Sequence, residues 1–374
     1  MNNRSAFIWA AILAIILAGC WDQRLLKEHS LVLAIGYDRT NDEKILKTVT
    51  FPKSNRGGGQ QSLPLNDSKV LSQTGDTVKD AENHMDQIIP EKFDRSKAKV
   101  IFLGKQLASH GIFPTLDSIY RDLRGPLNAT LAVFDGKAKD ALSAKTGESM
   151  LVSDVYSELL DSAEDAGITK NENVQSACPI ILSEGKDLVL PYVSLKQDKL
   201  PNVKGLALFN GDRFTGTLNI KETSMFLILS DQKPKGTTLN LKISSDKKKH
   251  EKNFVNIAVR GNKRNIKVNV KNGQIHAKVN VKLEVEIDEY AIEHLNEEKE
   301  VKDLSRRIEN KLNKIAKKTL AKMQEANNDS LGLGEKVQAY HHSTWKKNDW
   351  KKVYPEIPIE AAFHVKIIRH GIIN

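Results

Sequence analysis

The segment 275-IHAKVNVKLEVEI-287 alternates apolar and polar residues over its whole length. A period of two is typical of a β-strand with one face in the core and the other in solvent. A shorter alternation, 266-IKVNV-270, precedes it, and Asn272-Gly273 between the two is a dipeptide that favours a tight hairpin turn. These residues therefore predict a long antiparallel hairpin whose apolar face needs a cover.

The segment that follows predicts a helix that can supply this cover. Its apolar residues recur at near-helical spacing, at Val301, Leu304, Ile308, Leu312, Ile315, Leu320 and Met323. A coiled coil with another chain would explain the same stripe, although packing on the chain's own sheet is simpler. The helix breaks at 327–334, and 363–368 predicts a last strand. Residues 263–374 thus predict a C-terminal domain of antiparallel sheet packed with one long helix.

Residues 200–262 predict a small middle domain of mixed α+β structure. The segment 205-GLALF-209 leads into Asn210-Gly211, which indicates a hairpin with a return strand at 214–218. A short buried helix is expected at 222–229, followed by strands at 237–243 and 254–259. Before this domain, the segment from Pro191 to Pro201 resembles a linker.

Residues 25–195 predict an N-terminal α/β domain, because strands and helices alternate along them. Strands are expected at 31–38, 44–51, 99–103 and 129–134, and helices at 76–89, from Pro114, at 138–144 and at 152–166. The segment 54–64 reads as a loop, and its three glycines lack the Lys-Ser/Thr that a phosphate-binding loop requires. The expected fold class is therefore α/β and α+β in three domains.

The N-terminus has the order of a bacterial lipoprotein signal. Positive charge comes first, an apolar run from Ala6 to Ala18 follows, and Gly19-Cys20 ends it. The run is too short to span a bilayer, so an uncleaved anchor is the weaker interpretation. Residues 1–19 are expected to be a signal peptide, and 20–24 the lipidated N-terminus, with two acyl chains holding Cys20 on the bilayer.

The remaining residues give no sign of catalysis, metal binding or a cofactor. Cys178 has no second thiol to pair with once Cys20 is acylated, and it is expected to be structural. His341 and His342 are adjacent, which does not direct both side chains at one metal ion. The carboxylates Glu284 and Glu286 are expected on the wet face of their strand.

The formal net charge of +10 falls to +9 when Arg4 leaves with the signal peptide, and on a tethered protein this excess favours anionic lipid headgroups. Nucleic acid is not expected, because of the export signal and because basic residues are spread among acidic ones. Two charge runs, Lys247-Lys248-Lys249 and Arg260 to Arg264, flank the middle unit. Such runs are usually solvated turns, but we expect at least one of Lys247, Lys248, Lys249, Arg260 and Arg264 to help dock the protein on lipid headgroups or on acidic loops of a partner.

Several short motifs, in this order along the whole chain, resemble the Ger(x)C family of spore germination lipoproteins. They are Gly19-Cys20-Trp21-Asp22, 35-IGYD-38, 98-AKVIFLG-104, Leu107-Ala108 with Gly111-Ile112, Arg121-Asp122, 204-KGLALF-209, 216-GTL-218, Glu222-Thr223, 331-LGLG-334, Trp345, Trp350 and Gly371. Leu25 and Tyr37 depart from the usual family pattern. The motifs are individually unspecific, whereas their order is specific, and the match resembles the B-type receptor member.

The resemblance implies the C subunit of a nutrient germinant receptor, needed for nutrient-triggered germination. Such a subunit is not an enzyme; it is lipid-anchored on the outer face of the inner spore membrane beside two integral membrane subunits, A and B. Only Cys20 carries over as a functional residue. Direct binding of a small molecule stays open. A solute-binding lipoprotein of a transporter is the main alternative, with two similar α/β lobes expected, and a tethered cell-wall hydrolase is a further one.

Overall fold

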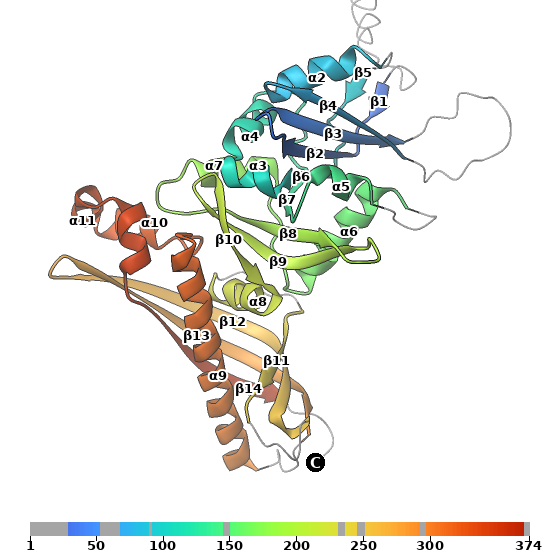
Figure 1. Ribbon diagram of the computed structural model, residues 1–374. Helices are drawn as coiled ribbons and strands as arrows, with labels where there is room; N and C mark the ends of the chain where they lie inside the picture. The colour runs from blue at the N-terminus through green and yellow to red at the C-terminus, as the bar shows by residue number, and fades with distance from the viewer. Residues whose placement is uncertain are drawn as a thin grey trace, which may run out of the picture.

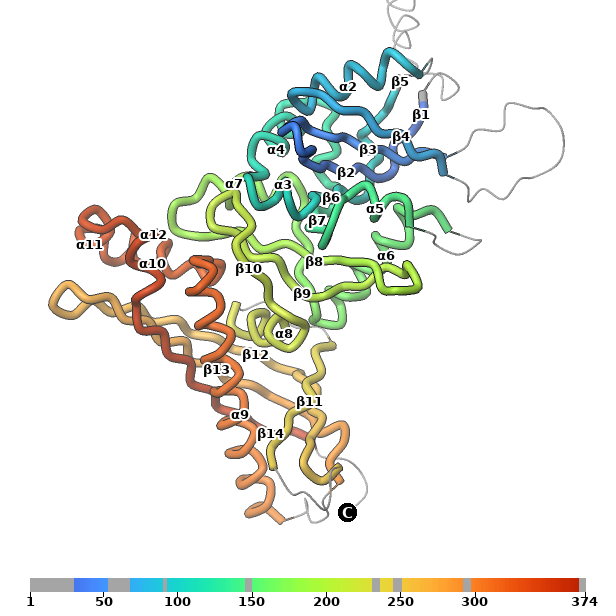
Figure 2. Tube along the Cα trace, in the orientation of Figure 1, coloured from blue at the N-terminus to red at the C-terminus, as the bar shows by residue number. Residues whose placement is uncertain are grey.

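The computed structural model describes residues 29–52, 68–89, 92–144, 150–230, 236–244, 251–291 and 297–369. They form two modules, one built on an eight-stranded sheet and the other on a four-stranded sheet. Figure 1 shows the N-terminal module above the C-terminal module, with α8 (Ile220–Leu229) between them. The trace in Figure 2 follows the chain once from one module into the other. The two sheets differ in size and topology, unlike the paired lobes expected of a solute-binding lipoprotein.

The eight-stranded sheet has the order β10-β9-β8-β7-β6-β2-β3-β4. Its strands are β2 (Ala34–Arg39), β3 (Ile45–Pro52), β4 (Ser68–Gly75), β6 (Val100–Gly104), β7 (Thr130–Phe134), β8 (Val189–Leu195), β9 (Pro201–Asn210) and β10 (Arg213–Asn219). The four central strands are parallel, and an antiparallel pair extends the sheet at each edge. A separate parallel pair joins β1 (His29–Leu31) to β5 (Lys92–Asp94).

Helices cover both faces of this sheet, as the alternation of elements predicts. They are α2 (Val78–Asp86), α3 (Lys105–His110), α4 (Phe113–Tyr120), α5 (Ala138–Leu142), α6 (Val152–Asp165) and α7 (Val174–Ile181). Residues of α2, α3, α4 and α7 share one apolar core, and those of α5 and α6 share the other. All five residues of β6 are buried because it lies between these two layers.

The expected linker at Pro191–Pro201 is wrong, since Pro191 to Leu195 lie inside β8. β8 pairs with β9 over seven residues, while its register with β7 covers only Tyr192 and Val193. Pro191 therefore lies outside the β7 register, where its missing N–H removes no bond to β7. The connection is a short turn, in which Lys199 has a positive φ of 63°.

Residues 200–262 are divided between the two modules instead of forming a sheet of their own. β9 and β10 extend the N-terminal sheet, whereas β11 (Thr238–Lys242) and the start of β12 (Phe254–Lys271) belong to the C-terminal sheet. Between them, α8 is buried at every residue from Thr223 to Leu229, because it is packed from both sides. The expected short buried helix is thus present, and it shares one apolar core with residues of β8, β9 and β10 and with the C-terminal sheet.

The C-terminal sheet has the order β11-β12-β13-β14, with β13 at Gln274–Tyr290 and β14 at Ile359–Arg369. The predicted hairpin is confirmed, with φ of 51° at Asn272 and 80° at Gly273. β12 is one continuous strand, so the expected turn at 260–264 is wrong; a bulge between Val259 and Gly261 accommodates the irregular pattern.

The expectation of a purely antiparallel C-terminal sheet is also wrong, because β14 pairs with β13 in parallel. α9 (Glu298–Glu325), α10 (Leu333–Tyr340), α11 (His342–Lys347) and α12 (Trp350–Val353) return the chain to the end where β13 began. The predicted apolar stripe of α9 packs on this sheet. In Figure 1, α9 runs along β13 and β14. None of the described helices combines the length and apolar composition needed to cross a bilayer.

Candidate functional site at the junction of the modules

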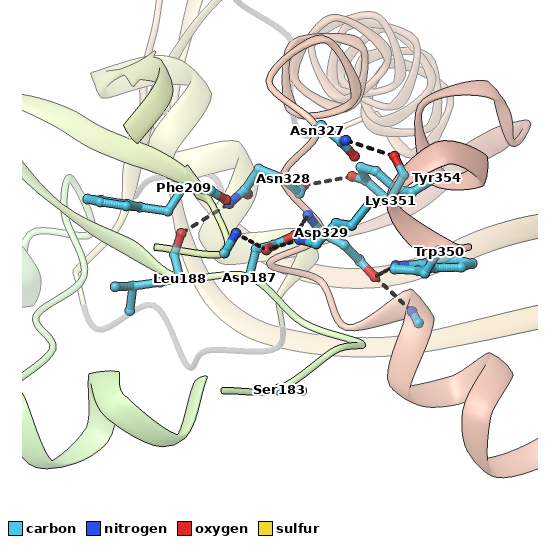
Figure 3. A network of polar contacts seen from close by, with 12 residues as sticks. Ser183, Asp187, Leu188, Phe209, Asn327, Asn328, Asp329, Trp350, Lys351 and Tyr354 are labelled. Atoms are coloured by element: carbon cyan, nitrogen blue, oxygen red, sulfur yellow. Dashed lines mark hydrogen bonds and ion pairs between the residues drawn. The ribbon is translucent and has the colours of Figure 1, made fainter. Parts of the chain in front are cut away.

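A buried polar network lies where the N-terminal and C-terminal modules meet (Figure 3). One side is Asp187, in the segment leading into β8, and the opposite side is Asn328-Asp329, just after α9. α12 and the turn that follows it add Trp350, Lys351 and Tyr354. Asp187, Asn328 and Asp329 are almost completely shielded from solvent. Protein donors and acceptors therefore take the place of water around these three buried side chains.

Asp187 ties three separate segments together through one carboxylate. Its Oδ1 accepts from the backbone N–H of Gly211, at 2.9 Å, and from the ammonium of Lys351. Its Oδ2 accepts from the backbone N–H of Asp329 at 2.8 Å. These contacts join the β9–β10 turn to the segment after α9 and to α12.

Asp329 stands before the first turn of α10 and accepts its free N–H groups. Its oxygens accept from Leu333 N at 2.9 Å and Gly334 N at 2.7 Å, and Trp350 Nε1 donates at 3.1 Å. Burial raises the pKa of Asp329 to about 8, the N–H donors act in the opposite direction, and the nearby charge of Asp187 adds to the rise. The Asp329 side chain thus satisfies N–H groups at the start of α10, although its burial disfavours the charged form.

Asn328 attaches the same segment to the N-terminal sheet. Its Nδ2 donates to the carbonyl of Leu188, at 3.0 Å, just before β8, and to that of Phe209, at 2.6 Å, near the end of β9. The Tyr354 hydroxyl donates to the Asn328 carbonyl at 2.8 Å. Close backbone contact completes the junction, since a Cβ on Gly334 would lie 2.8 Å from the Cα of Gly185.

The geometry of the junction supports a mechanical role. Each carboxylate oxygen of Asp187 and Asp329 accepts at least one hydrogen bond from the protein itself. Carboxylates engaged in this way hold backbone segments in place. The sequence motif 331-LGLG-334 and Trp350, which carried the family resemblance, lie within this network; their structural role needs Asp187, which the sequence analysis did not single out.

A second polar cluster lies inside the N-terminal module. Lys47 is 1% exposed and contacts Glu82, which also contacts Arg95; Arg95 in turn donates to Asp122 at 2.6 Å. Burial lowers the pKa of Lys47 to about 8, although Glu82 opposes this change. A cavity of only about 60 Å³ lies beside the cluster. Two cations and two anions balance one another here, which makes the cluster an internal ion network.

The predicted site residues are spread over different environments. Cys20 and Lys247, Lys248 and Lys249 lie outside the described residues. Arg260, on β12, pairs with Glu286 at 2.8 Å on the solvent-facing side of the sheet. Arg264 donates to the carbonyl of Leu229 at 3.0 Å and so caps the end of α8. Their joint role as a docking surface stays a prediction.

His341 and Cys178 each lie against other parts of the fold, whereas His342 is exposed. His341 Nε2 lies 3.2 Å from the carbonyl of Val268. Within the described ranges, no three His, Cys, Asp or Glu side chains are grouped as metal ligands. Cys178 is buried in α7, and burial raises the pKa of its thiol, which lowers its reactivity.

Comparison with known proteins places both modules in one family. Residues 22–195 match the spore germination protein N-terminal domain, and residues 204–371 match the C-terminal domain described as spore germination B3/GerAC like. The gap between the two matches coincides with the turn from β8 to β9 and the first residues of β9.

Individual members of this family are similar to the chain over almost its whole length. Spore germination protein GerQC of Bacillus cereus is 22% identical and aligns with 96% of this chain and 97% of its own length. Spore germination protein KC of Bacillus subtilis (strain 168) is 24% identical, with 96% and 94% covered. The crystal structure of the GerBC protein shares the fold with a TM-score of 0.57 at 17% identity, covering 89% of this chain and 96% of that one. The chain therefore belongs to the Ger(x)C, or GerAC-like, family of spore germination proteins.

Proposed function

We propose that this protein is a lipid-anchored, non-enzymatic subunit of a membrane nutrient germinant receptor. The observation that carries the proposal is the length of the family match, which extends over both modules and over 96% of the chain in two relatives named as spore germination proteins. A protein sharing only a domain with this family would match over one module. In this role the chain acts on the outer face of the inner spore membrane, beside two integral membrane subunits.

The anchor in this proposal is a diacylglyceryl group on Cys20. Residues 1–19 act as the signal peptide, and the mature chain starts at 20. Support comes from the order of charge, apolar run and small residues before Cys20, and from the family match, which begins at residue 22. Two acyl chains give stable attachment, whereas one gives only marginal, reversible binding.

The non-enzymatic part of the proposal is supported by the use of the buried polar groups. The best-formed polar network joins the modules, and its carboxylates are occupied by backbone and side-chain donors. We infer that the network transmits force or orientation between the anchored N-terminal module and the C-terminal module. The cations Lys247, Lys248, Lys249 and Arg260 are proposed to contact the membrane complex.

Spores that lack this chain, in a strain without other germinant receptors, test the function. Nutrient-triggered germination should disappear, while germination by calcium dipicolinate, which bypasses receptors, should persist. Restoring the chain should recover the nutrient response, and Cys20→Ala should fail to do so. The matched control is Cys178→Ala, which leaves the anchor intact. An unchanged nutrient response in spores without the chain would refute the proposal.

The docking cations need a separate experiment. Charge reversal at Lys247, Lys248 and Lys249 should reduce recovery of the chain with the membrane subunits, since the change replaces attraction by repulsion. Reversal at the exposed residues Lys317 and Lys318, on α9, serves as the control. Equal recovery of both variants would remove these three lysines from the proposed contact.

A further inference from the structure

Three exposed apolar side chains lie around one end of the N-terminal module. They are Ile88, Tyr120 and Leu123, and Leu123 is completely exposed, at 104% of its reference area. A single exposed leucine is common on protein surfaces, but a group of large apolar side chains indicates a contact surface.

The strand pair β1–β5 places this group beside the start of the described chain. His29 pairs with Lys92, only four residues after Ile88. At the other end of the pair, Leu31 pairs with Asp94, and the next residue, Arg95, holds Asp122, the neighbour of Leu123. Figure 1 shows β1, β5 and α2 together at the end of the module remote from the C-terminal module.

The turn that carries Leu123 is a built structure. The Asp122 carboxylate accepts from the backbone N–H of Arg124 at 3.0 Å and from Arg95 at 2.6 Å. The Gly125 N–H donates to the Asp122 carbonyl at 2.8 Å. A Cβ on Gly125 would lie 2.2 Å from the Ile119 carbonyl oxygen, so the turn needs glycine there. These bonds hold the backbone in a shape that presents Leu123 to solvent.

The charges around Leu123 indicate what the turn contacts. Arg121 and Arg124 flank it and are exposed, as is Lys97 after β5. Arg121 pairs with Asp117 on its own helix, which leaves its guanidinium at the surface. An apolar side chain between cations fits the boundary of an anionic bilayer, where headgroups attract the cations and the acyl layer accepts the leucine.

We propose that the turn Arg121–Gly125, together with Ile88, contacts the bilayer that holds Cys20. This inference rests on the lipid anchor of the proposed function. Eight residues lie between Cys20 and His29, and the nine steps from one Cα to the next span at most about 32 Å when fully extended. The anchor therefore keeps this end of the module near the lipid, where even a weak contact forms at a high effective concentration. The contact fixes how the N-terminal module is oriented on the bilayer.

The test uses the full lipidated chain, reconstituted in vesicles of phosphatidylcholine and phosphatidylglycerol. An environment-sensitive fluorophore is attached at Leu123→Cys, in a Cys178→Ser background. The matched control is Leu182→Cys, at the end of α7 near the junction, where the leucine is 68% exposed. Lipids that carry a quencher should reduce emission at 123 by at least about two-fold more than at 182, because only 123 enters the lipid boundary. In vesicles of phosphatidylcholine alone this difference should shrink.

The outcomes separate this inference from the proposed function. Mass spectrometry of Cys20 first establishes the lipid; an unmodified Cys20 would overturn the anchor and, with it, the basis of the inference. With Cys20 lipidated, equal quenching at 123 and 182 would overturn the membrane contact alone. A second result would also overturn it: the probe at Leu123→Cys shows no quenching, and a separate Leu123→Asp variant no longer associates with the membrane subunits. That combination assigns the turn to a protein partner.

Discussion

The carboxylate of Asp187 accepts the backbone N–H of Asp329 at 2.8 Å, although the two residues are 142 positions apart in the chain. This one bond connects the N-terminal sheet to the segment that leads from α9 into α10. Asp187 also holds Lys351, and Asp329 holds Trp350. A change at either carboxylate is therefore expected to loosen both modules at once.

Asp187→Ala should strongly destabilise the protein. The substitution leaves the N–H groups of Gly211 and Asp329 without their acceptor, and each unsatisfied buried donor costs about 1–3 kcal/mol. We expect the free energy of unfolding, measured in urea, to fall by about 3 kcal/mol. Asp42→Ala, in an exposed turn, is the control and should change it by less than about 0.5 kcal/mol. Similar values for the two variants would contradict the interpretation of the junction.

The raised pKa of Asp329 predicts that its contribution to stability falls as pH rises. The folded protein holds this proton up to about pH 8, whereas the unfolded chain releases it near 3.8. Between these values the folded state binds more protons, so the unfolding free energy declines by at most about 1.4 kcal/mol per pH unit.

Denaturation of the wild type and of Asp329→Asn from pH 5 to 9 measures this contribution. The stability of the wild type relative to the variant should decrease toward pH 8 and then level off. Lys47, whose pKa is lowered to about 8, titrates in both proteins and cancels in the comparison. A constant difference across this range would show that Asp329 is already ionised at pH 5.

Glu82→Ala should cost about 3–5 kcal/mol of unfolding free energy, because it leaves Lys47 buried without a counter-charge. Burial alone would raise the pKa of Glu82, but Lys47 and Arg95 outweigh it and lower the pKa to about 2. The ionised carboxylate therefore stabilises the fold above its ordinary pKa of 4.5, and this contribution is lost as pH falls toward 2.

A double-mutant cycle with Lys47→Met and Glu82→Met checks the pair. The double variant should lose less stability than the sum of the single variants, since it leaves no charge unpaired. Lys79→Ala is the control: Lys79 also contacts Glu82, at 3.2 Å, but it is exposed and should contribute below about 1 kcal/mol. Strict additivity would show that Lys47 and Glu82 do not interact energetically.

The free edge of β14 is protected by two side chains of α9. Glu309 Oε1 accepts from Val365 N at 2.8 Å, and Asn313 Oδ1 accepts from Phe363 N at 3.1 Å. The length of about one turn of helix is close to that of two residues of strand. Glu309 and Asn313, four residues apart on α9, therefore reach amides that are two residues apart on β14. Unprotected edge strands can pair with other chains.

Glu309→Ala combined with Asn313→Ala should speed amide hydrogen exchange at Phe363 and Val365 by about ten-fold or more and should promote aggregation. Asn310→Ala, on an exposed position of the same helix, is the control. Unchanged exchange at both amides would show that α9 does not protect this edge.

The sequence by itself determined the local elements. The period of two in 275–287 and the Asn272-Gly273 turn specified the hairpin, and the apolar stripe specified α9, because both signals depend only on near neighbours. Alternating strands and helices likewise specified the layered N-terminal module. An element with weak periodicity, such as β4, and one of only six residues, such as α3, were not predicted. The order of motifs along the chain was sufficient to indicate the family, which the comparisons then confirmed.

Only the tertiary structure decided which sheet each strand joins. The strands in 200–262 could form a domain of their own, or β9 and β10 could join one sheet and β11 and β12 another. The local sequence does not distinguish these arrangements, because strand pairing depends on partners far along the chain. The parallel placement of β14 depends in the same way on where α9 and the helices after it return the chain. Asp187 and Asp329 are ordinary acidic residues in the sequence. They form a junction because folding buries both of them away from water. Buried polar groups need hydrogen-bond partners, and the segment of Asp329 supplies one to Asp187.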